Sequence, residues 1–249
     1  MIDYSTLGIQ LEKAAKENIA LSVKTGPILN VNLQIARILS SRIRRICTFE
    51  CMVIENDVGY SVIIDEKRRE FEVLMACYAA GLRISEISIL EGSYSQACCL
   101  LRQDIESLTH LTHVLKDTRK GKKAPNIAVL ELQMKKIYSD LTEVAHLTSD
   151  EILRGFSALS HHHPADRITL PMGADCLPCY RRDICNVLLG IRALTMICII
   201  GVFEKYIKMY FSQLAISSET MNELKSEYEK LSLEIPELCE HPLDFQLIF

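Results

Sequence analysis

Polar and ionisable side chains recur at helical spacing in two stretches of the chain, and their types could do chemistry. In the first stretch, Gly92–Leu115, Arg102 and Glu106 are four positions apart, and His113 lies farther along the same stripe. Residues four apart share one face of a helix. Groups at the margin of an apolar seam are half-desolvated and need partners. The pair therefore predicts either a structural ion pair or part of a polar pocket.

A second polar edge comes from Tyr138, Thr142 and His146, in the stretch Asn126–His146. Two helices joined by a short linker pack antiparallel, so we expect this edge to meet the first one. His146 also falls at a helix end, where the helix dipole favours a cation without any catalytic role. In the functional interpretation, the catalytic groups are Arg102, Glu106 and His146, and the substrate-binding groups are Tyr138, Thr142 and His113.

The run ILEGSYSQACCLLRQDIESL, followed later by YSDLTEVAH, resembles bacterial helical proteins of the HEPN-like, abortive-infection type. Such proteins share Arg-x-x-x-Glu on one helix and Tyr-x-x-Leu-Ser/Thr-x-x-x-His on a later one. The resemblance covers about residues 89–146. It implies a helical bundle, often a dimer, sometimes with ribonuclease activity in defence or toxin systems.

Nuclease members of that family carry Arg closely followed by His, and the nearest match here is Arg154 and His161. Metal-independent cleavage of RNA needs a base for the ribose 2′-OH and a cation beside the phosphate, and these two residues have the right types. His161 falls where a short predicted helix ends, whereas the family's motif lies on a helix. A ribonuclease using this pair, or the Arg102, Glu106 and His146 cluster, is therefore an alternative to a non-catalytic protein.

Cysteine and histidine also gather near a second irregular stretch. Cys176 and Cys179 have the spacing that clasps one zinc ion, and Cys185 or His161 could complete four ligands. A second CxxC or HxxxH is missing, and the run His161–His163 next to a proline is also typical of a solvated loop. Zinc is therefore the one metal cofactor that the sequence suggests, and otherwise we expect none.

The elements that position these residues are predicted to be helices. Apolar residues recur three and four positions apart over most of the chain, and the small number of glycines and prolines opposes an all-β fold. We expect one all-α bundle over residues 1–249, with an irregular loop at about 160–178. The predicted helices are Ser5–Lys24, Ile28–Ile54, Asp65–Leu90, Ser93–Leu115, Asn126–His146, a short one ending near Leu159, Arg181–Gln213 and Ser218–Leu233.

Charge and motifs narrow the function classes. The net charge of −4 gives no global attraction to nucleic acid, and basic clusters without interleaved aromatics make no DNA signature. The motifs GxxxxGK[ST], GxGxxG, GxSxG and HExxH are absent. Together with the HEPN-like resemblance, these absences favour a protein that binds a protein partner or RNA, with a ribonuclease and a small-ligand-binding bundle as the alternatives.

The cysteines and one apolar helix bear on location and assembly. Most of the 10 cysteines sit in apolar helical patterns, where they act as small hydrophobes, so we expect no disulfides and a cytoplasmic protein. The stretch Ile184–Phe203 is long enough to span a bilayer, but a central Arg192 costs about 3 kcal/mol there. A buried helix is therefore preferred to a membrane span. If that helix lay at the edge of the bundle, a homodimer would cover it.

Overall fold

The computed structural model describes residues 4–24, 66–118, 126–146, 180–210 and 218–234. These residues form six α-helices and one 3₁₀ turn, with no strand among them, so the predicted all-α bundle is confirmed. The elements are α1 (Tyr4–Lys24), α3 (Glu66–Leu90), α4 (Tyr94–Lys116), η1 (Ile127–Val129), α5 (Leu132–Ala145), α7 (Arg182–Tyr210) and α8 (Ser218–Glu234).

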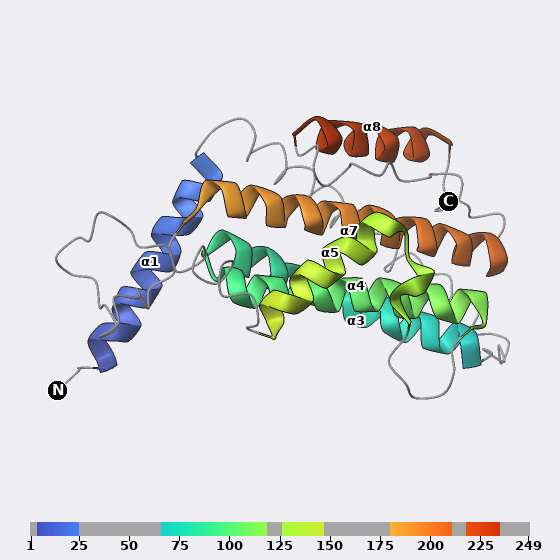
Figure 1. Ribbon diagram of the computed structural model, residues 1–249, viewed down its shortest axis with the longest axis horizontal. Coiled ribbons are helices and arrows are strands. Elements are labelled where there is room, and N and C mark those ends of the chain that lie inside the picture. Colours follow the sequence, from blue (N-terminus) through green and yellow to red (C-terminus); the bar gives the residue numbers. More distant parts are fainter. Residues whose placement is uncertain (1–3, 25–65, 119–125, 147–179, 211–217, 235–249) are drawn as a thin grey trace, which may run out of the picture.

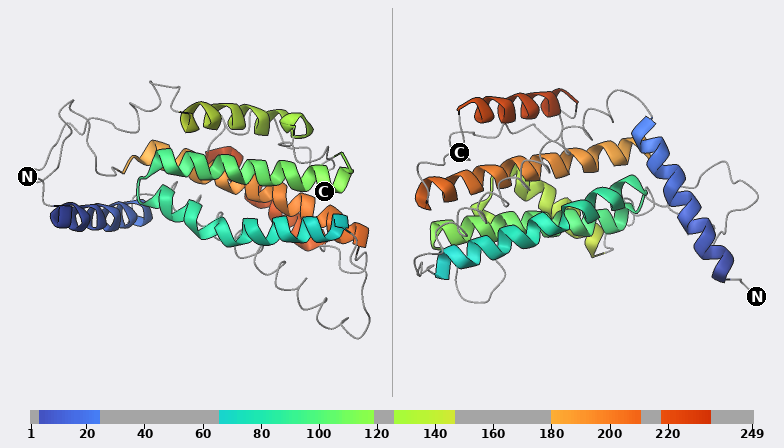
Figure 2. Two further views of the ribbon diagram at one scale, coloured as in Figure 1. Left: turned by 90° about the horizontal axis from the view of Figure 1, so that it is seen from below. Right: turned by 180° about the vertical axis from the view of Figure 1, so that it is seen from behind.

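A helical hairpin and one long helix form the body of the bundle. Helices α3 and α4 run side by side in opposite directions, and α7 lies along them in the direction of α4 (Figures 1 and 2). The tight turn between α3 and α4 contains Gly92 at φ 81°, a left-handed conformation that glycine adopts without steric cost. Helix α5 crosses α4 obliquely, and α8 lies on the far side of α7 (Figure 1).

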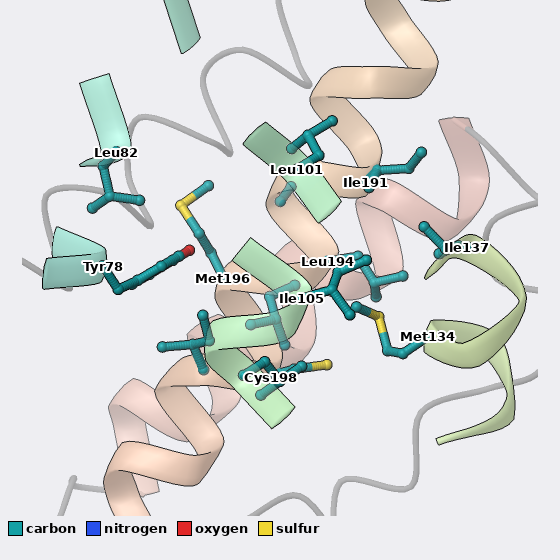
Figure 3. Close-up of a cluster of buried hydrophobic side chains, with 14 of the residues drawn as sticks. Tyr78, Leu82, Leu101, Ile105, Met134, Ile137, Ile191, Leu194, Met196 and Cys198 are labelled. Carbon is teal, nitrogen blue, oxygen red and sulfur yellow. The ribbon is translucent and has the colours of Figure 1, made fainter. Parts of the chain in front are cut away.

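Helix α7 is the centre of the core. Twenty of its residues are buried. From Leu188 to Ile207, every residue except Lys205 is buried. Figure 3 shows Leu101 and Ile105 of α4 meeting Leu194 of α7 and Met134 of α5. A helix that is apolar all round is typical of a core element.

Helices α3 and α7 are both long and apolar enough to cross a membrane by length and composition alone. In α7, 83% of the most apolar window is buried inside the chain, which is typical of the core helix of a bundle. In α3 only 33% of the corresponding window is buried. Most of the apolar window of α3 is therefore exposed, whereas that of α7 is covered within the chain, so the reason given above for a dimer through Ile184–Phe203 does not hold.

The start of α7 is fixed to the rest of the bundle by polar contacts. The buried Tyr94 hydroxyl accepts a hydrogen bond from Arg181 N at 2.7 Å and donates one to Arg181 O at 3.1 Å. Asn18 of α1 donates to Glu91 O at 2.8 Å and accepts from Tyr180 N at 3.2 Å. One end of α1 is thereby attached to the bundle, while its N-terminal part diverges from it (Figure 2).

The prediction of one continuous helix over Asn126–His146 is wrong at its start. Asn126 accepts a hydrogen bond from Ala128 N at 2.9 Å and caps the short η1 turn. Leu130 then has extended backbone and a buried side chain, and Glu131 is extended too, so the α-helix begins at Leu132. The local Asx cap competes with the helix for backbone donors.

The other described helices begin and end within a few residues of their predicted bounds. The predicted helix Ile28–Ile54, the short helix ending near Leu159 and the loop at about 160–178 lie outside the described residues.

Candidate functional site

Arg102, Glu106 and Tyr138 lie together where α4 meets α5. Arg102 Nη2 is 3.0 Å from Glu106 Oε1, and the Tyr138 hydroxyl donates a hydrogen bond to the same oxygen at 2.9 Å. The Arg102 guanidinium carbon is 5.7 Å from the centre of the Tyr138 ring, within range of a cation–π interaction. The predicted ion pair and its contact with the second helix are therefore confirmed. Arg102 Nε is shielded from solvent and makes no hydrogen bond among the described residues.

The other two residues of the second polar edge do not join this cluster by any described hydrogen bond. Thr142 Oγ1 donates to Tyr138 O of its own helix at 2.7 Å. His146 is exposed and is the C-terminal cap residue of α5. The side chain thus lies at the end of the helix where the dipole favours a cation, in keeping with its non-catalytic explanation.

His113 has both ring nitrogens engaged. Nε2 is 2.9 Å from Asn126 O, which can only accept, so this nitrogen carries the proton. Nδ1 is 2.7 Å from Thr118 Oγ1, and in the neutral imidazole it accepts the hydroxyl proton. The side chain joins the end of α4 to the residue that caps η1. In this arrangement neither nitrogen is available to a substrate.

The predicted catalytic pair Arg154 and His161 and the predicted zinc ligands Cys176 and Cys179 lie outside the described residues. Cys185 lies in the first turns of α7 and is fully buried, and burial raises the pKa of its thiol to about 12. Zinc binds the thiolate form of cysteine. Because the raised pKa keeps the Cys185 thiol protonated, a zinc ion would have to displace that proton in order to bind. Among the described residues, no three histidine, cysteine, aspartate or glutamate side chains are placed to share a metal ion.

A second polar cluster, which the sequence analysis did not assemble, lies in the core around Arg192 of α7. The guanidinium is 1% exposed. Its Nη2 donates to Leu82 O at 2.7 Å and its Nε to Ser85 Oγ at 3.2 Å, both on α3. Its Nη1 is 3.4 Å from Glu86 Oε2. A buried charge needs such partners, and here they join α7 to α3.

Asp104 and Tyr78 extend this cluster between α4 and α3. Asp104 is partly exposed as a residue, but its Oδ2 atom is shielded from solvent and makes no hydrogen bond among the described residues. Burial raises the pKa of Asp104 to about 7, although the positive charge of Arg192 opposes the shift. Burial and the nearby Asp104 carboxylate likewise raise the pKa of Tyr78 well above its usual value. The one residue that could have indicated this cluster from the sequence is Arg192, because a cation inside an apolar helix requires acidic neighbours.

The cavities between the described helices include three that bear on these residues. One of about 890 Å³ adjoins His110 and His113 between α3 and α4, and one of about 330 Å³ lies between α5 and α7 around Ile137 and Val187. The third, of about 90 Å³, lies where η1 and α5 meet α4 and α7. The lining residues of these three do not include Arg102, Glu106 or Tyr138. The polar cluster at α4 and α5 thus holds two helices together and does not line a described cavity.

The outer face of α3 carries exposed apolar side chains. Val73 is 55% exposed and Ile84 is 58% exposed. Between them, Ala76, Cys77 and Ala80 are also exposed. Spacings of three and four place these side chains on one stripe of the helix.

Gly81 lies beside that stripe, in the interior of α3. Apart from the backbone of its own helix, a Cβ atom added there would meet no atom of the described residues within 4 Å. Glycine inside a helix costs about 1 kcal/mol relative to alanine. Packing among the described residues does not require this glycine.

No family model, curated protein or solved structure matches this chain.

Proposed function

We propose that this protein is a non-catalytic interaction protein of the HEPN-like type that assembles through the outer face of α3, with a second copy of the chain as the partner. The observation that carries the proposal is the exposed apolar stripe Val73–Ile84 on a helix only 33% buried over its most apolar window. Soluble monomers rarely leave contiguous apolar surface of this kind uncovered.

A second copy fits this face because the stripe is symmetric about its own centre. Val73 and Ile84 are equally far from the midpoint of the stripe, and so are Cys77 and Ala80. When two α3 helices cross antiparallel about a two-fold axis, each Val73 lies opposite the partner's Ile84. Such an interface is isologous and closes at two subunits.

Small residues at the centre of the stripe favour close approach of the two helices. Ala76, Cys77 and Ala80 carry little or no bulk beyond Cβ, and Gly81 carries none. Small residues at a helix crossing let the two backbones approach closely. This gives the mid-helix glycine a role that its own chain does not supply.

The competing functions are less well supported by the described residues. The polar groups expected to form an active site, Arg102, Glu106 and Tyr138, are bonded to one another. The net charge of −4 opposes general attraction to RNA. A homodimer agrees with what the HEPN-like resemblance implies. We place this dimer in the reducing cytoplasm.

Light scattering and cross-linking of the full chain test the proposal. We expect a mass twice the 28.2 kDa of the monomer in detergent-free buffer. An Ala80→Cys variant should form a disulfide-linked dimer on mild oxidation, because Cys77 of the other copy lies opposite and within the roughly 7 Å Cα separation that a disulfide allows.

Two variants control this experiment. Ala80→Cys combined with Cys77→Ser should lose the fast cross-link, and Val187→Cys, an exposed site on α7, should not gain it. Val73→Lys with Ile84→Lys should give a folded monomer. A wild-type mass of 28.2 kDa across a wide concentration range, or a requirement for detergent or lipid vesicles, would overturn the proposal.

A further inference from the structure

We infer that the groove between α5 and α7 binds an apolar amine in its protonated, monocationic form. It is called here the aspartate-rimmed groove. Its walls are apolar residues of α5 and α7, Cys98 of α4 lies at its base, and the carboxylates of Asp140 and Asp183 belong to its lining. This inference is independent of assembly through α3, because no residue of the lining belongs to that helix.

Each wall of the groove is one stripe of a helix, with residues three and four positions apart. The α5 wall consists of Ile137, Asp140, Leu141 and Val144. Apolar residues within Ile184–Ile191 of α7 form the facing wall at the same spacing. Asp140 therefore occupies a position that faces the groove, on a stripe whose other members are apolar and buried.

The groove is open because α5 and α7 diverge. Both helices pack on α4, but α5 crosses it obliquely whereas α7 runs along it (Figure 1). Cys98 at the base is buried, and Val187 on the α7 wall is left 40% exposed. A concave apolar surface with a few polar groups is typical of small-molecule sites.

The charged groups of the lining select a cation. The lining contains two aspartates and no lysine or arginine. Asp183 already pairs with Arg181 Nη2 at 2.9 Å, so the exposed Asp140 is the carboxylate that an incoming ammonium group meets. An ammonium group finds carboxylate acceptors here, whereas an anionic ligand finds none of the cationic side chains that it needs.

The volume sets the size of the apolar part of the ligand. About 330 Å³ is available, about twice the roughly 150 Å³ of an apolar cavity that binds benzene. Naphthylmethylammonium has twice as many non-hydrogen atoms as benzene, so its fused rings fit between the walls. A single methylene group joins the rings to the ammonium group, which can then lie at the aspartate rim.

Calorimetric titration of the full-length protein with naphthylmethylammonium chloride tests the inference. We expect saturable binding of one amine per chain. Naphthylmethanol keeps the rings without the charge and should bind at least about threefold more weakly. Methylammonium keeps the charge without the rings and should bind at least about tenfold more weakly. Naphthylacetate, an anion, should bind more weakly than the alcohol.

Variants locate the binding. Asp140→Asn keeps the shape of the side chain and should weaken the amine at least about threefold, with no effect on naphthylmethanol. Glu229→Gln removes an exposed carboxylate from α8 and is the matched control, which should leave the affinity unchanged. Val187→Ser should weaken the amine and the alcohol by the same factor, because it removes apolar wall without changing the charge.

Four results would overturn the inference: no saturable binding of the amine, equal affinity of the amine for wild type and Asp140→Asn, an equal loss in Glu229→Gln, or naphthylacetate binding as tightly as the amine. Unchanged binding in Val187→Ser would likewise place the ligand outside this groove. All three substitutions are at exposed positions, so we expect each variant to fold, and circular dichroism checks this.

Discussion

The Tyr138 hydroxyl of α5 donates a hydrogen bond to Glu106 Oε1 of α4 at 2.9 Å, and Arg102 pairs with that same oxygen. Arg102 and Glu106 keep 27% and 36% of their side-chain surface exposed. Water therefore screens the pair, and the contact stabilises the helix junction only moderately.

The first prediction follows from this geometry. Tyr138→Phe removes one hydrogen bond to a charged acceptor at a partly exposed site, so we expect the free energy of unfolding to fall by about 1 kcal/mol. Urea unfolding measures it. Glu12→Gln, on an exposed α1 pair, should change the stability by less than about 0.5 kcal/mol. A ribonuclease assay that responded to Tyr138→Phe while stability did not would return the cluster to a catalytic role.

The second prediction concerns Arg192. Arg192→Met keeps much of the volume but leaves Glu86 and Asp104 without their buried cation. Breaking a buried ion pair from one side costs about 3–5 kcal/mol, and we expect a loss of stability in that range. Arg181→Met, which removes an exposed ion pair with Asp183, is the matched control. Equal effects of the two substitutions would show that the Arg192 contacts are not as buried as described.

The third prediction is a pH dependence that comes from Asp104. Its pKa is about 7 in the folded chain against a usual value of 3.8, so the folded state holds this proton more tightly than the unfolded state. The stabilisation is complete below pH 3.8 and is lost as the pH rises towards about 7. We expect Asp104→Asn to gain stability relative to wild type over that interval, by a few kcal/mol at most.

Denaturant unfolding of both proteins at several pH values measures this difference. Because the comparison is between two proteins at each pH, titrating groups common to both cancel. Asp140→Asn, at an exposed position of α5, should show no such trend. A constant difference between wild type and Asp104→Asn from pH 4 to pH 8 would mean that Asp104 titrates as an ordinary surface carboxylate.

The sequence could predict the helices and the cluster at α4 and α5 because both depend on local spacing. Arg102 and Glu106 are one turn apart, and a short linker brings Tyr138 back against them. The core cluster escaped prediction because Tyr78, Asp104 and Arg192 come from three helices, and their meeting depends on the rotation of each helix about its axis. The break at Leu130 escaped because an apolar residue at helical spacing fits a helix and an extended connection equally well.

The fourth prediction concerns the thiols. The five cysteines among the described residues form no disulfide, and they are Cys77, Cys98, Cys99, Cys185 and Cys198. Only Cys77 among them is exposed. The pKa values of Cys98, Cys185 and Cys198 are raised to about 12 by burial, so few of these thiols ionise at neutral pH. In the Val73→Lys, Ile84→Lys monomer, iodoacetamide labelling followed by mass spectrometry should modify Cys77 well before those three, whereas in the wild-type dimer the second copy of α3 should cover Cys77 and slow its modification. Denaturation without reductant should then release close to all 10 thiols, and a count near zero would indicate an oxidising compartment.

The last prediction separates the two effects of Gly81. Because a Cβ atom there meets nothing among the described residues, Gly81→Ala should stabilise the monomer by about 0.5–1 kcal/mol through higher helix propensity. The same methyl group would intrude where the two α3 helices cross, so the variant should also dissociate at higher protein concentration than wild type. Unfolding measured below the dissociation range, together with light scattering above it, tests both parts. If Gly81→Ala were more stable and equally dimeric, α3 would not be the interface, since the glycine would then have no role on either side of the helix.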